Sequence, residues 1–316
     1  MPEVVTVGET LVLFSPGQNG PLRYVDSFKK RIAGAESNTA IALSRLGHSC
    51  GWISKIGDDE FGQFILREIR AEGVDVSRVR IDENAPTGIM FKEIFDGMET
   101  RVYYYRKGSA ASMLRPEDID PEYIRNAKIL HITGITPALS ISCLETIWSS
   151  IRTAKENGVL ISFDPNIRLK LWSREQASMV LNEILPYADI VFSGVDEGEI
   201  IIGESNPERL IDILLELGVG TVALKMGAEG CWVADRKSRH RINAVEVGKK
   251  VDPIGAGDAF NAGFLAGFLE GKGIEECGRM GNIMGAFAIT TSGDIEGLPG
   301  RRELEQFMKK DKGITR

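Results

Sequence analysis

Val251-Asp252-Pro253-Ile254-Gly255-Ala256-Gly257-Asp258-Ala259-Phe260 joins a loop of small residues to a run, 258–269, that is typical of a helix. Small residues let the backbone approach a ligand closely. The N–H groups at a helix start have no intrahelical partners and form a ready anion site. Such donors stabilise the charge that develops when a phosphoryl group is transferred, and losing one comparable donor costs about 10²–10³ in rate. We therefore interpret Gly255, Ala256 and Gly257 as a catalytic anion-binding loop.

Asp258 stands at the mouth of this loop, and two interpretations fit it. An acidic residue in the first turn of a helix is favoured by the helix dipole, by about 0.3–1 kcal/mol. Alternatively, the carboxylate orients an attacking hydroxyl. An ordinary aspartate, with a pKa of about 3.9, is a weak base. Phosphoryl transfer tolerates a weak base, because its loose transition state mainly needs a positioned nucleophile. Spacing alone leaves both interpretations open.

Two competing phosphate-binding motifs are excluded. The pattern GxxxxGK[ST] of P-loop enzymes does not occur in the chain. A dinucleotide-binding fingerprint is also disfavoured, because Phe260 stands where its third glycine belongs and the segment does not follow the first strand.

Composition narrows the possible partners. The 316 residues are 43% hydrophobic and 26% charged, which is typical of a water-soluble globular protein. The formal net charge of −7 argues against a general binder of nucleic acid or of anionic membranes, since both need excess positive charge. We therefore expect no nucleic-acid partner and no membrane partner.

Cysteines, histidines and the start of the chain point to an intracellular protein. The four cysteines are far apart and form no CxxC pair, which indicates reduced thiols and not a disulfide frame or a zinc site. The three histidines form no HExxH motif. The chain opens on the strand-like run Val4-Val5-Thr6-Val7 without a signal-like leader. No apolar stretch reaches the roughly 18 residues of a membrane span. The expected location is the cytoplasm.

Strand-like and helical patterns alternate along most of the sequence. Apolar residues spaced by three and four predict helices at about 37–46, 60–72 and 141–151, and Ser173 with Gln176 forms a capping box for another. Strands are expected at 49–56, 128–133, 159–164, 189–193 and 220–225. This order predicts an α/β fold with a mainly parallel sheet covered on both faces. Ligands would bind where the loops Asp164-Pro165-Asn166 and Ser193-Gly194 follow their strands.

Two stretches, residues about 10–33 and 86–107, look like β-strands without intervening helices. Residues 88–95 and 101–105 flank the turn-like Asp96-Gly97-Met98-Glu99 and predict a hairpin. We expect one domain over residues 1–316, with a small β lid formed from about 10–33 and 86–112 that shields the reacting groups from water. The lid sheet has edges and apolar surface to cover, so we also expect a homo-oligomer formed through the lid sheets.

The chain resembles a known family, the ribokinase-like carbohydrate kinases of the phosphofructokinase-B type. Its C-terminal signature is matched by Asp252-Pro253 followed by Gly255-Ala256-Gly257-Asp258. The N-terminal signature is matched by 33–40, running on to Arg45-Leu46-Gly47. Further matches are Gly57-Asp58-Asp59-x-Phe61-Gly62 and Asn282-x-x-Gly285-Ala286, so the resemblance covers nearly the whole chain.

The resemblance implies a phosphotransferase that uses ATP and Mg²⁺, with Asp258 as catalytic base. It implies that ATP contacts Asn166, Arg168, Ser193, Lys225, Gly227, Gly230, Gly255, Gly257 and Asn282. An Asn-x-x-Glu motif associated with Mg²⁺ in the family is read here as Asp196-Glu197-Gly198-Glu199, which makes Glu199 the candidate to hold the metal through water. Some relatives are activated by a monovalent cation, and the sequence leaves that open.

Within the family, the segments 103–110, 164–172 and Gly293-Asp294 are most similar to kinases for the sugar acid 2-keto-3-deoxygluconate. This likeness implies sugar contacts from Gly34, Asn38, Tyr104, Arg106, Arg168, Asp258 and Asp294. An arginine fork suits a carboxylate, whereas a neutral sugar would leave it unpaired.

Several alternatives to this assignment remain open. Arg106 is also explained as an edge-strand charge, and Arg168 as a ligand of the ATP phosphates. Some relatives carry an aromatic residue where Met90 stands, which leaves galactonate-type acids possible. A kinase for fructose or ribose, or a sugar-binding regulator without catalysis, also fits the fold.

Overall fold

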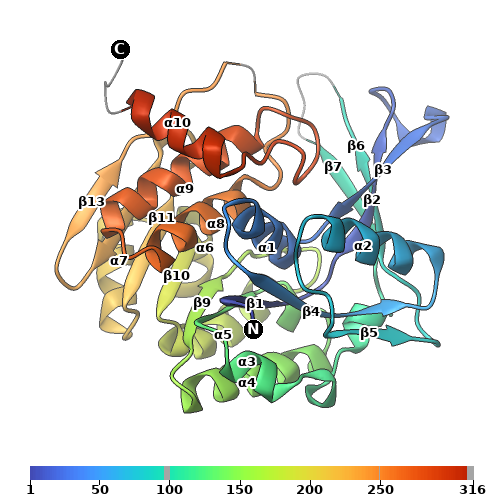
Figure 1. Ribbon diagram of the computed structural model, residues 1–316, viewed down its shortest axis with the longest axis horizontal. Helices are drawn as coiled ribbons and strands as arrows, with labels where there is room; N and C mark the ends of the chain where they lie inside the picture. Colours follow the sequence, from blue (N-terminus) through green and yellow to red (C-terminus); the bar gives the residue numbers. More distant parts are fainter. Residues whose placement is uncertain (96–99, 249, 312–316) are drawn as a thin grey trace.

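The computed structural model describes residues 1–95, 100–248 and 250–311 (Figure 1). Within these residues nine strands form one large sheet in the order β13-β12-β11-β10-β9-β8-β1-β4-β5. Its strands are β1 (Val4–Val7), β4 (Cys50–Gly57), β5 (Val79–Asp82), β8 (Ile129–Thr133), β9 (Leu160–Asp164), β10 (Ile190–Gly194), β11 (Thr221–Lys225), β12 (Cys231–Asp235) and β13 (Arg239–Ile242). From β5 to β11 every neighbouring pair is parallel, while β12 and β13 are antiparallel.

Both faces of this sheet are buried under helices. Successive strand residues point to opposite faces, so that Val4 packs into one hydrophobic cluster and Val5 into the other. The first cluster lies under α1 (Ala35–Arg45), α2 (Glu60–Ala71), α8 (Ala256–Leu269), α9 (Ile274–Ala288) and α10 (Arg301–Asp311). The second lies under α3 (Pro121–Arg125), α4 (Ile141–Glu156), α5 (Arg174–Ile184), α6 (Val195–Ile202) and α7 (Pro207–Glu216). The prediction of a three-layer α/β fold is therefore confirmed.

A small sheet projects from one end of this body (Figure 1). Its order is β3 (Phe28–Ala33), β2 (Leu11–Pro16), β6 (Ile89–Glu93) and β7 (Arg101–Tyr105). The pair β6–β7 is antiparallel, which confirms the predicted strands of a hairpin, whereas the predicted turn 96–99 lies outside the described residues. The strands fall in the two segments that interrupt the βα alternation.

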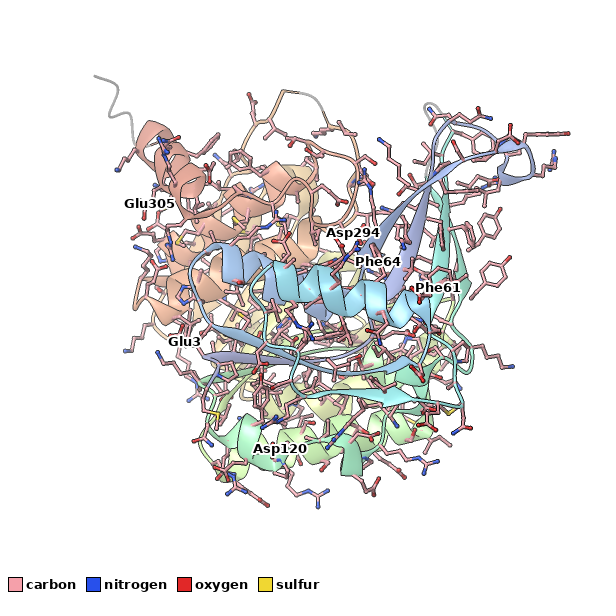
Figure 2. The ribbon with its side chains drawn as sticks, turned by 45° about the vertical axis from the view of Figure 1, so that its right-hand side comes forward. Glu3, Phe61, Phe64, Asp120, Asp294 and Glu305 are labelled. Carbon is pink, nitrogen blue, oxygen red and sulfur yellow. The ribbon has the colours of Figure 1, made fainter. Side chains whose placement is uncertain are left out.

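The two faces of the small sheet differ. Leu11, Met90 and Tyr104 face a cavity against the body. On the opposite face Phe14 stacks on Phe91, with ring centroids 4.9 Å apart. Phe61 of α2 meets Phe14 edge to face at 5.8 Å, and Figure 2 shows Phe61 and Phe64 on α2 beside the small sheet. Helix α2 thus holds the small sheet to the body at its base.

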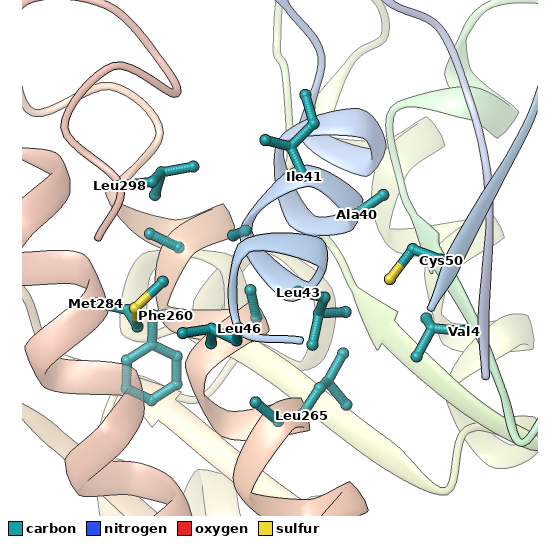
Figure 3. Close-up of a cluster of buried hydrophobic side chains, with 14 of the residues drawn as sticks. Val4, Ala40, Ile41, Leu43, Leu46, Cys50, Phe260, Leu265, Met284 and Leu298 are labelled. Carbon is teal, nitrogen blue, oxygen red and sulfur yellow. The ribbon is translucent and has the colours of Figure 1, made fainter. Parts of the chain in front are cut away.

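Helix α8 begins at Ala256, two residues before the predicted start and within the anion-binding loop, and it is fixed by apolar packing. Figure 3 shows Leu43 of α1 and Leu46, which directly follows that helix, with Phe260 and Leu265 of α8 in one buried cluster. Gly263 lets α9 approach closely, because a Cβ there would lie 2.6 Å from the Met280 carbonyl oxygen. The start of α8 is therefore held rigidly against the body.

The local predictions for helices are also confirmed. Ser173 caps α5 through its Oγ, which accepts from the Gln176 N–H, and the Gln176 side chain completes the capping box. In the part of the chain that the structure describes, each helix is too short or too polar to traverse a lipid bilayer.

Candidate active site

A cavity of about 470 Å³ lies between the small sheet and the carboxyl ends of the large-sheet strands. Parallel α/β sheets bind ligands at this edge. Every side chain or glycine predicted to contact the sugar lines it: Gly34, Asn38, Tyr104, Arg106, Arg168, Asp258 and Asp294. Figure 2 places Asp294 where the helical body meets the small sheet. Elements far apart in the sequence thus converge on one space, which we call the first cavity.

A second cavity of about 620 Å³ adjoins the first. Its walls include apolar Val245, Phe260 and Ile289, which suit a flat ring, and the predicted nucleotide contacts Gly227, Gly230 and Asn282. The Asn282 side chain donates to the Asn243 carbonyl oxygen at 3.0 Å and so shapes the wall. Lys225, Pro253 and Gly257 line both cavities. The two spaces therefore meet at the anion-binding loop.

Gly255 gives this loop its shape. It is the N-cap of α8 and has a φ of +83°, in the left-handed region that favours glycine. A Cβ at this position would lie 2.7 Å from the Asp294 carbonyl oxygen. The close approach of two backbones and the φ value both require glycine. The loop therefore depends on Asp294 as well as on α8.

Asp258 is buried at the start of α8 and faces the first cavity. Its Oδ2 accepts a hydrogen bond of 2.8 Å from the Asn38 side chain. Burial raises the pKa of Asp258 to about 7; the charges of Asp164 and Asp294 act in the same direction, and Asn38 and Arg168 oppose them. The group is therefore a stronger base than an ordinary aspartate and is positioned by an amide. Its surroundings differ from those of a solvated helix cap.

Asp164 and Lys225 form an ion pair where the cavities meet. Lys225 Nζ lies 2.7 Å from Asp164 Oδ2, which also accepts from the Asn261 side chain at 2.6 Å. Burial alone would raise the pKa of Asp164, but Lys225 and Asn261 hold it below its usual value. Burial alone would lower the pKa of Lys225, but Asp164 and Glu197 raise it. Lys225 therefore stays protonated, 3.5 Å from the position a Gly257 Cβ would occupy, and its charge lies beside the anion-binding loop.

The structure does not fit the prediction for Glu199. Glu199 is exposed and lines neither cavity, whereas Glu197 lines the first one. Two residues along a helix turn a side chain by about 200°, so only one of the two can face the cavity. Glu197 accepts from the Ile167 and Gly194 N–H groups at 2.9 and 2.8 Å. Ser193 also lines neither cavity: its hydroxyl donates to the Gly194 carbonyl oxygen at 2.9 Å.

The side chains near Glu197 fit a Mg²⁺ ion. Burial, followed by the charge of Asp164, raises the pKa of Glu197, so a cation beside it would be favourable. Asn166, with a φ of 39°, has a buried Oδ1 without a hydrogen-bond partner. Oxygen ligands of this kind, few in number and completed by phosphate and water, are what Mg²⁺ prefers. No cluster of three or more acidic, His or Cys ligands occurs among the described residues.

The two predicted carboxylate-binding arginines differ in their surroundings. Arg106 is buried and paired with Glu9, to which its Nε donates at 2.7 Å. Ser109 donates to the other oxygen of Glu9 at 2.5 Å. Arg168 lines the same cavity but is exposed, and no acidic group lies within ion-pair distance of it among the described residues. Arg168 is therefore the cation available to an anionic ligand.

Sequence reasoning placed Asp164 in a loop at the ligand-binding edge without assigning it a role, and it did not identify Glu9. Asp164 ends β9 at the ligand-binding edge of the sheet, and this position was a usable signal. Glu9 gave no comparable signal, since its partner Arg106 lies 97 residues away. Only folding brings that pair together.

Comparison with known proteins agrees with this geometry. A model for the pfkB family of carbohydrate kinases matches residues 1–301. The chain belongs to the pfkB carbohydrate kinase family. It is 40% identical over 315 residues to a 2-dehydro-3-deoxygluconokinase of Bacillus subtilis, covering 99% of this chain and 97% of that protein. It is 38% identical over 313 residues to a 2-dehydro-3-deoxygluconokinase of Thermoproteus tenax, covering 98% and 95%.

The solved structures give the same family and fold. A putative ribokinase II of Escherichia coli in complex with ATP and Mg²⁺ superimposes with a TM-score of 0.92 at 28% identity, covering 98% of this chain and 100% of that one. This pfkB carbohydrate kinase is accordingly an ATP-dependent sugar kinase, as its sequence predicted.

Proposed function

We propose that this pfkB kinase transfers phosphate from ATP to the 6-hydroxyl of 2-keto-3-deoxygluconate, also called 2-dehydro-3-deoxygluconate. The observation that carries the proposal is that Arg168, which has no ion-pair partner among the described residues, lines the same cavity as the buried carboxylate of Asp258. The cavity thus offers a cation for the acid group and a base for a hydroxyl of one molecule. The likeness to two 2-dehydro-3-deoxygluconokinases over nearly the whole chain supports this substrate.

The proposed mechanism assigns each group to one event. The sugar hydroxyl would donate its proton to Asp258, whose raised pKa suits a group that accepts a proton late in the transfer. The N–H groups of the anion-binding loop would stabilise the moving phosphoryl group, with Lys225 adding a positive charge. ATP would lie in the second cavity, since that space leads to the loop.

Mg²⁺ would be held near Asp164, Glu197 and Asn166 and, when bound, would neutralise phosphate charge. Arg106, fixed by Glu9, would shape the wall against the sugar, with Tyr104 beneath its guanidinium at 5.4 Å.

A panel of acceptors with coupled detection of ADP tests the substrate. We expect 2-keto-3-deoxygluconate to give a higher kcat/KM than fructose or ribose by at least about 10²-fold, because a neutral sugar brings no carboxylate to pair with Arg168. The panel also includes the galactonate-type acid, and a similar kcat/KM for both acids would indicate that the acid group alone is recognised. A preference for a neutral hexose would remove the acid-sugar proposal and leave the family assignment intact.

Changing Arg168 to Met should raise KM for the sugar acid by about 10- to 100-fold, since a hydrogen bond to a charged group contributes about 1.5–3 kcal/mol. The measurement is steady-state kinetics with each substrate varied in turn. Arg174→Met, a change at an exposed arginine on α5 that lines neither cavity, is the matched control. An unchanged KM for the acid together with a raised KM for ATP would assign Arg168 to the phosphates instead.

We also propose that two copies associate through their small sheets. The outward face carries Phe28 and Phe91 with Tyr103 and Tyr105, and Tyr105 is 65% exposed. Strands β3 and β7 are the edges of this sheet. Burying this aromatic surface and pairing the edges would stabilise a dimer.

Light scattering at micromolar concentration should therefore give the mass of a dimer, and Tyr105→Asp should shift it toward the monomer. Tyr187→Asp serves as the control, because Tyr187 is also exposed, by 45%, and is remote from the small sheet in sequence. A wild-type protein that is monomeric under these conditions would exclude the dimer.

A further inference from the structure

Lys92 of β6 is the one lysine in the described ranges whose side chain is completely buried, with 0% exposure. Its Nζ lies 3.0 Å from Asp252 Oδ2 and 3.0 Å from Asp294 Oδ1. Lys92 lines neither cavity, so it has no direct contact with either substrate site. A lysine is costly to bury unless its charge is paired. This one joins the small sheet to two carboxylates of the body.

Both carboxylates belong to the surroundings of the anion-binding loop. Asp252 Oδ1 accepts from the Ile254 N–H at 3.2 Å, one residue before Gly255. The backbone of Asp294 lies directly against Gly255, because a Cβ at Gly255 would lie 2.7 Å from the Asp294 carbonyl oxygen. Lys92 is therefore connected to the loop through both of its partners.

The same network reaches the base. The Asn38 amide that donates to Asp258 at 2.8 Å lies 3.5 Å from Asp294 Oδ2. A displacement of Asp294 would move Asn38 or leave it with one partner. The position of Asp258 is thus linked to Lys92 through two intervening side chains. In well-oriented reactions a misplacement of about 1 Å costs about 10²-fold in rate.

The charge balance between Asp252 and Asp294 depends on the ammonium group of Lys92. Burial alone would lower the pKa of Lys92, but Asp294 and Asp252 raise it, so the lysine stays protonated. Without it, two buried carboxylates would face each other uncompensated, which is unfavourable where water is scarce. A cation taken from solution would then be needed between them. The chain supplies that charge itself.

We propose that Lys92 is a positioning residue for phosphoryl transfer: its ammonium holds Asp252 and Asp294 together, so that the small sheet, the anion-binding loop and Asp258 are aligned without a monovalent cation from solution. The inference rests on the proposed function only for the choice of sugar acceptor. It predicts that this chain requires no monovalent cation for activity.

The first experiment measures wild-type kcat with K⁺ replaced by tetramethylammonium at equal ionic strength, using the acceptor that the wild type phosphorylates fastest. We expect wild-type kcat to change by less than about twofold on this exchange. Without K⁺, the kcat of Lys92→Ala should be about 10²-fold below that of the wild type. K⁺ should restore Lys92→Ala by at least about tenfold, because it fits between the carboxylates, whereas tetramethylammonium is too large. KM for both substrates should change much less than kcat, since Lys92 contacts neither.

Lys29→Met, at an exposed lysine of β3, is the control for removing a positive charge from the small sheet. A second measurement needs no sugar: thermal unfolding of Lys92→Ala in K⁺ and in tetramethylammonium. K⁺ should raise its Tm by about 2 °C or more, and that of the wild type by less than this. This distinguishes a wrong acceptor from a wrong role for Lys92.

The proposal is overturned if the wild type loses about tenfold or more without K⁺. It is equally overturned if Lys92→Ala keeps its kcat, or loses it with no recovery and no Tm shift specific to K⁺. Should Lys92→Ala fail to fold, Lys92→Arg, which keeps the charge, decides the matter. The proposal requires that Lys92→Arg folds and remains active without K⁺. An inactive or K⁺-dependent Lys92→Arg would count against Lys92 as a positioning residue.

Discussion

Replacing Asp258 with Asn is expected to lower kcat by about 10³–10⁴-fold, the upper range for loss of a positioned acid–base group. The amide has nearly the same shape but cannot accept the proton of the sugar hydroxyl. Affinity for a non-hydrolysable ATP analogue, measured by calorimetry, should change little, because Asp258 lines the first cavity and not the second. A variant with full turnover would refute the catalytic assignment.

Asp196→Asn is the matched control for this variant. Asp196 is also an acidic residue in the first turn of a helix, but it is exposed and lines neither cavity. If the helix dipole were the only reason for Asp258, the two variants would behave alike. We expect Asp196→Asn to retain activity within about twofold, as is usual for surface changes.

The same base predicts how the wild-type rate depends on pH. The pKa of Asp258 is raised to about 7, and the proposed mechanism needs its deprotonated form, so kcat/KM should fall as pH drops below 7. The charged groups that face Asp258 are Asp164 and Asp294, which raise its pKa, and Arg168, which lowers it. The measurement is kcat/KM between about pH 5.5 and 8.5. A flat profile over this range would contradict the predicted base.

Gly255→Ala should lower kcat by at least about 10²-fold, comparable to the loss of one donor to the transferring group. Gly255 has a φ of +83°, and the new methyl group would meet the Asp294 carbonyl oxygen at 2.7 Å. Relief of this clash must move the loop or Asp294, and either shift takes the N–H groups away from the phosphoryl group. Steady-state kinetics and thermal unfolding measure the effect.

Gly271→Ala separates this clash from backbone strain. Gly271 also has a positive φ, +71°, but a Cβ there would meet no atom within 4 Å. We expect its stability to fall by about 1–2 kcal/mol, the usual cost of a left-handed alanine, with kcat preserved. If Gly255→Ala were as active as Gly271→Ala, the geometry of the loop would not matter for transfer.

How far the sequence predicted the site differs from residue to residue. The loop Gly255-Ala256-Gly257 and Asp258 were predictable because loop, helix start and acid are adjacent in the chain. Glu197 was not, because it lies two residues from Glu199 and only the rotation of α6 selects between them. A run of acidic residues shows that carboxylates are present without showing which one faces the cavity.

Pairs that are distant in sequence were beyond prediction. Lys92 lies in a predicted hairpin strand, and nothing in the sequence of that strand indicates that it meets Asp252, 160 residues away. Glu9 pairs with Arg106 across 97 residues, which changes Arg106 from a free cation to a neutralised one. These pairings leave Arg168 as the cation available for the substrate.

The sequence by itself determined the α/β class, the small sheet, the family and which adjacent groups are proposed to bind phosphate and to act as base, because periodicity and local motifs encode them within a few residues. Only the tertiary structure decided which charges are compensated, which carboxylate faces the cavity and how the small sheet is tied to the loop. The physical reason is that burial and charge pairing depend on distances in space, and folding sets those distances between segments that the chain keeps far apart.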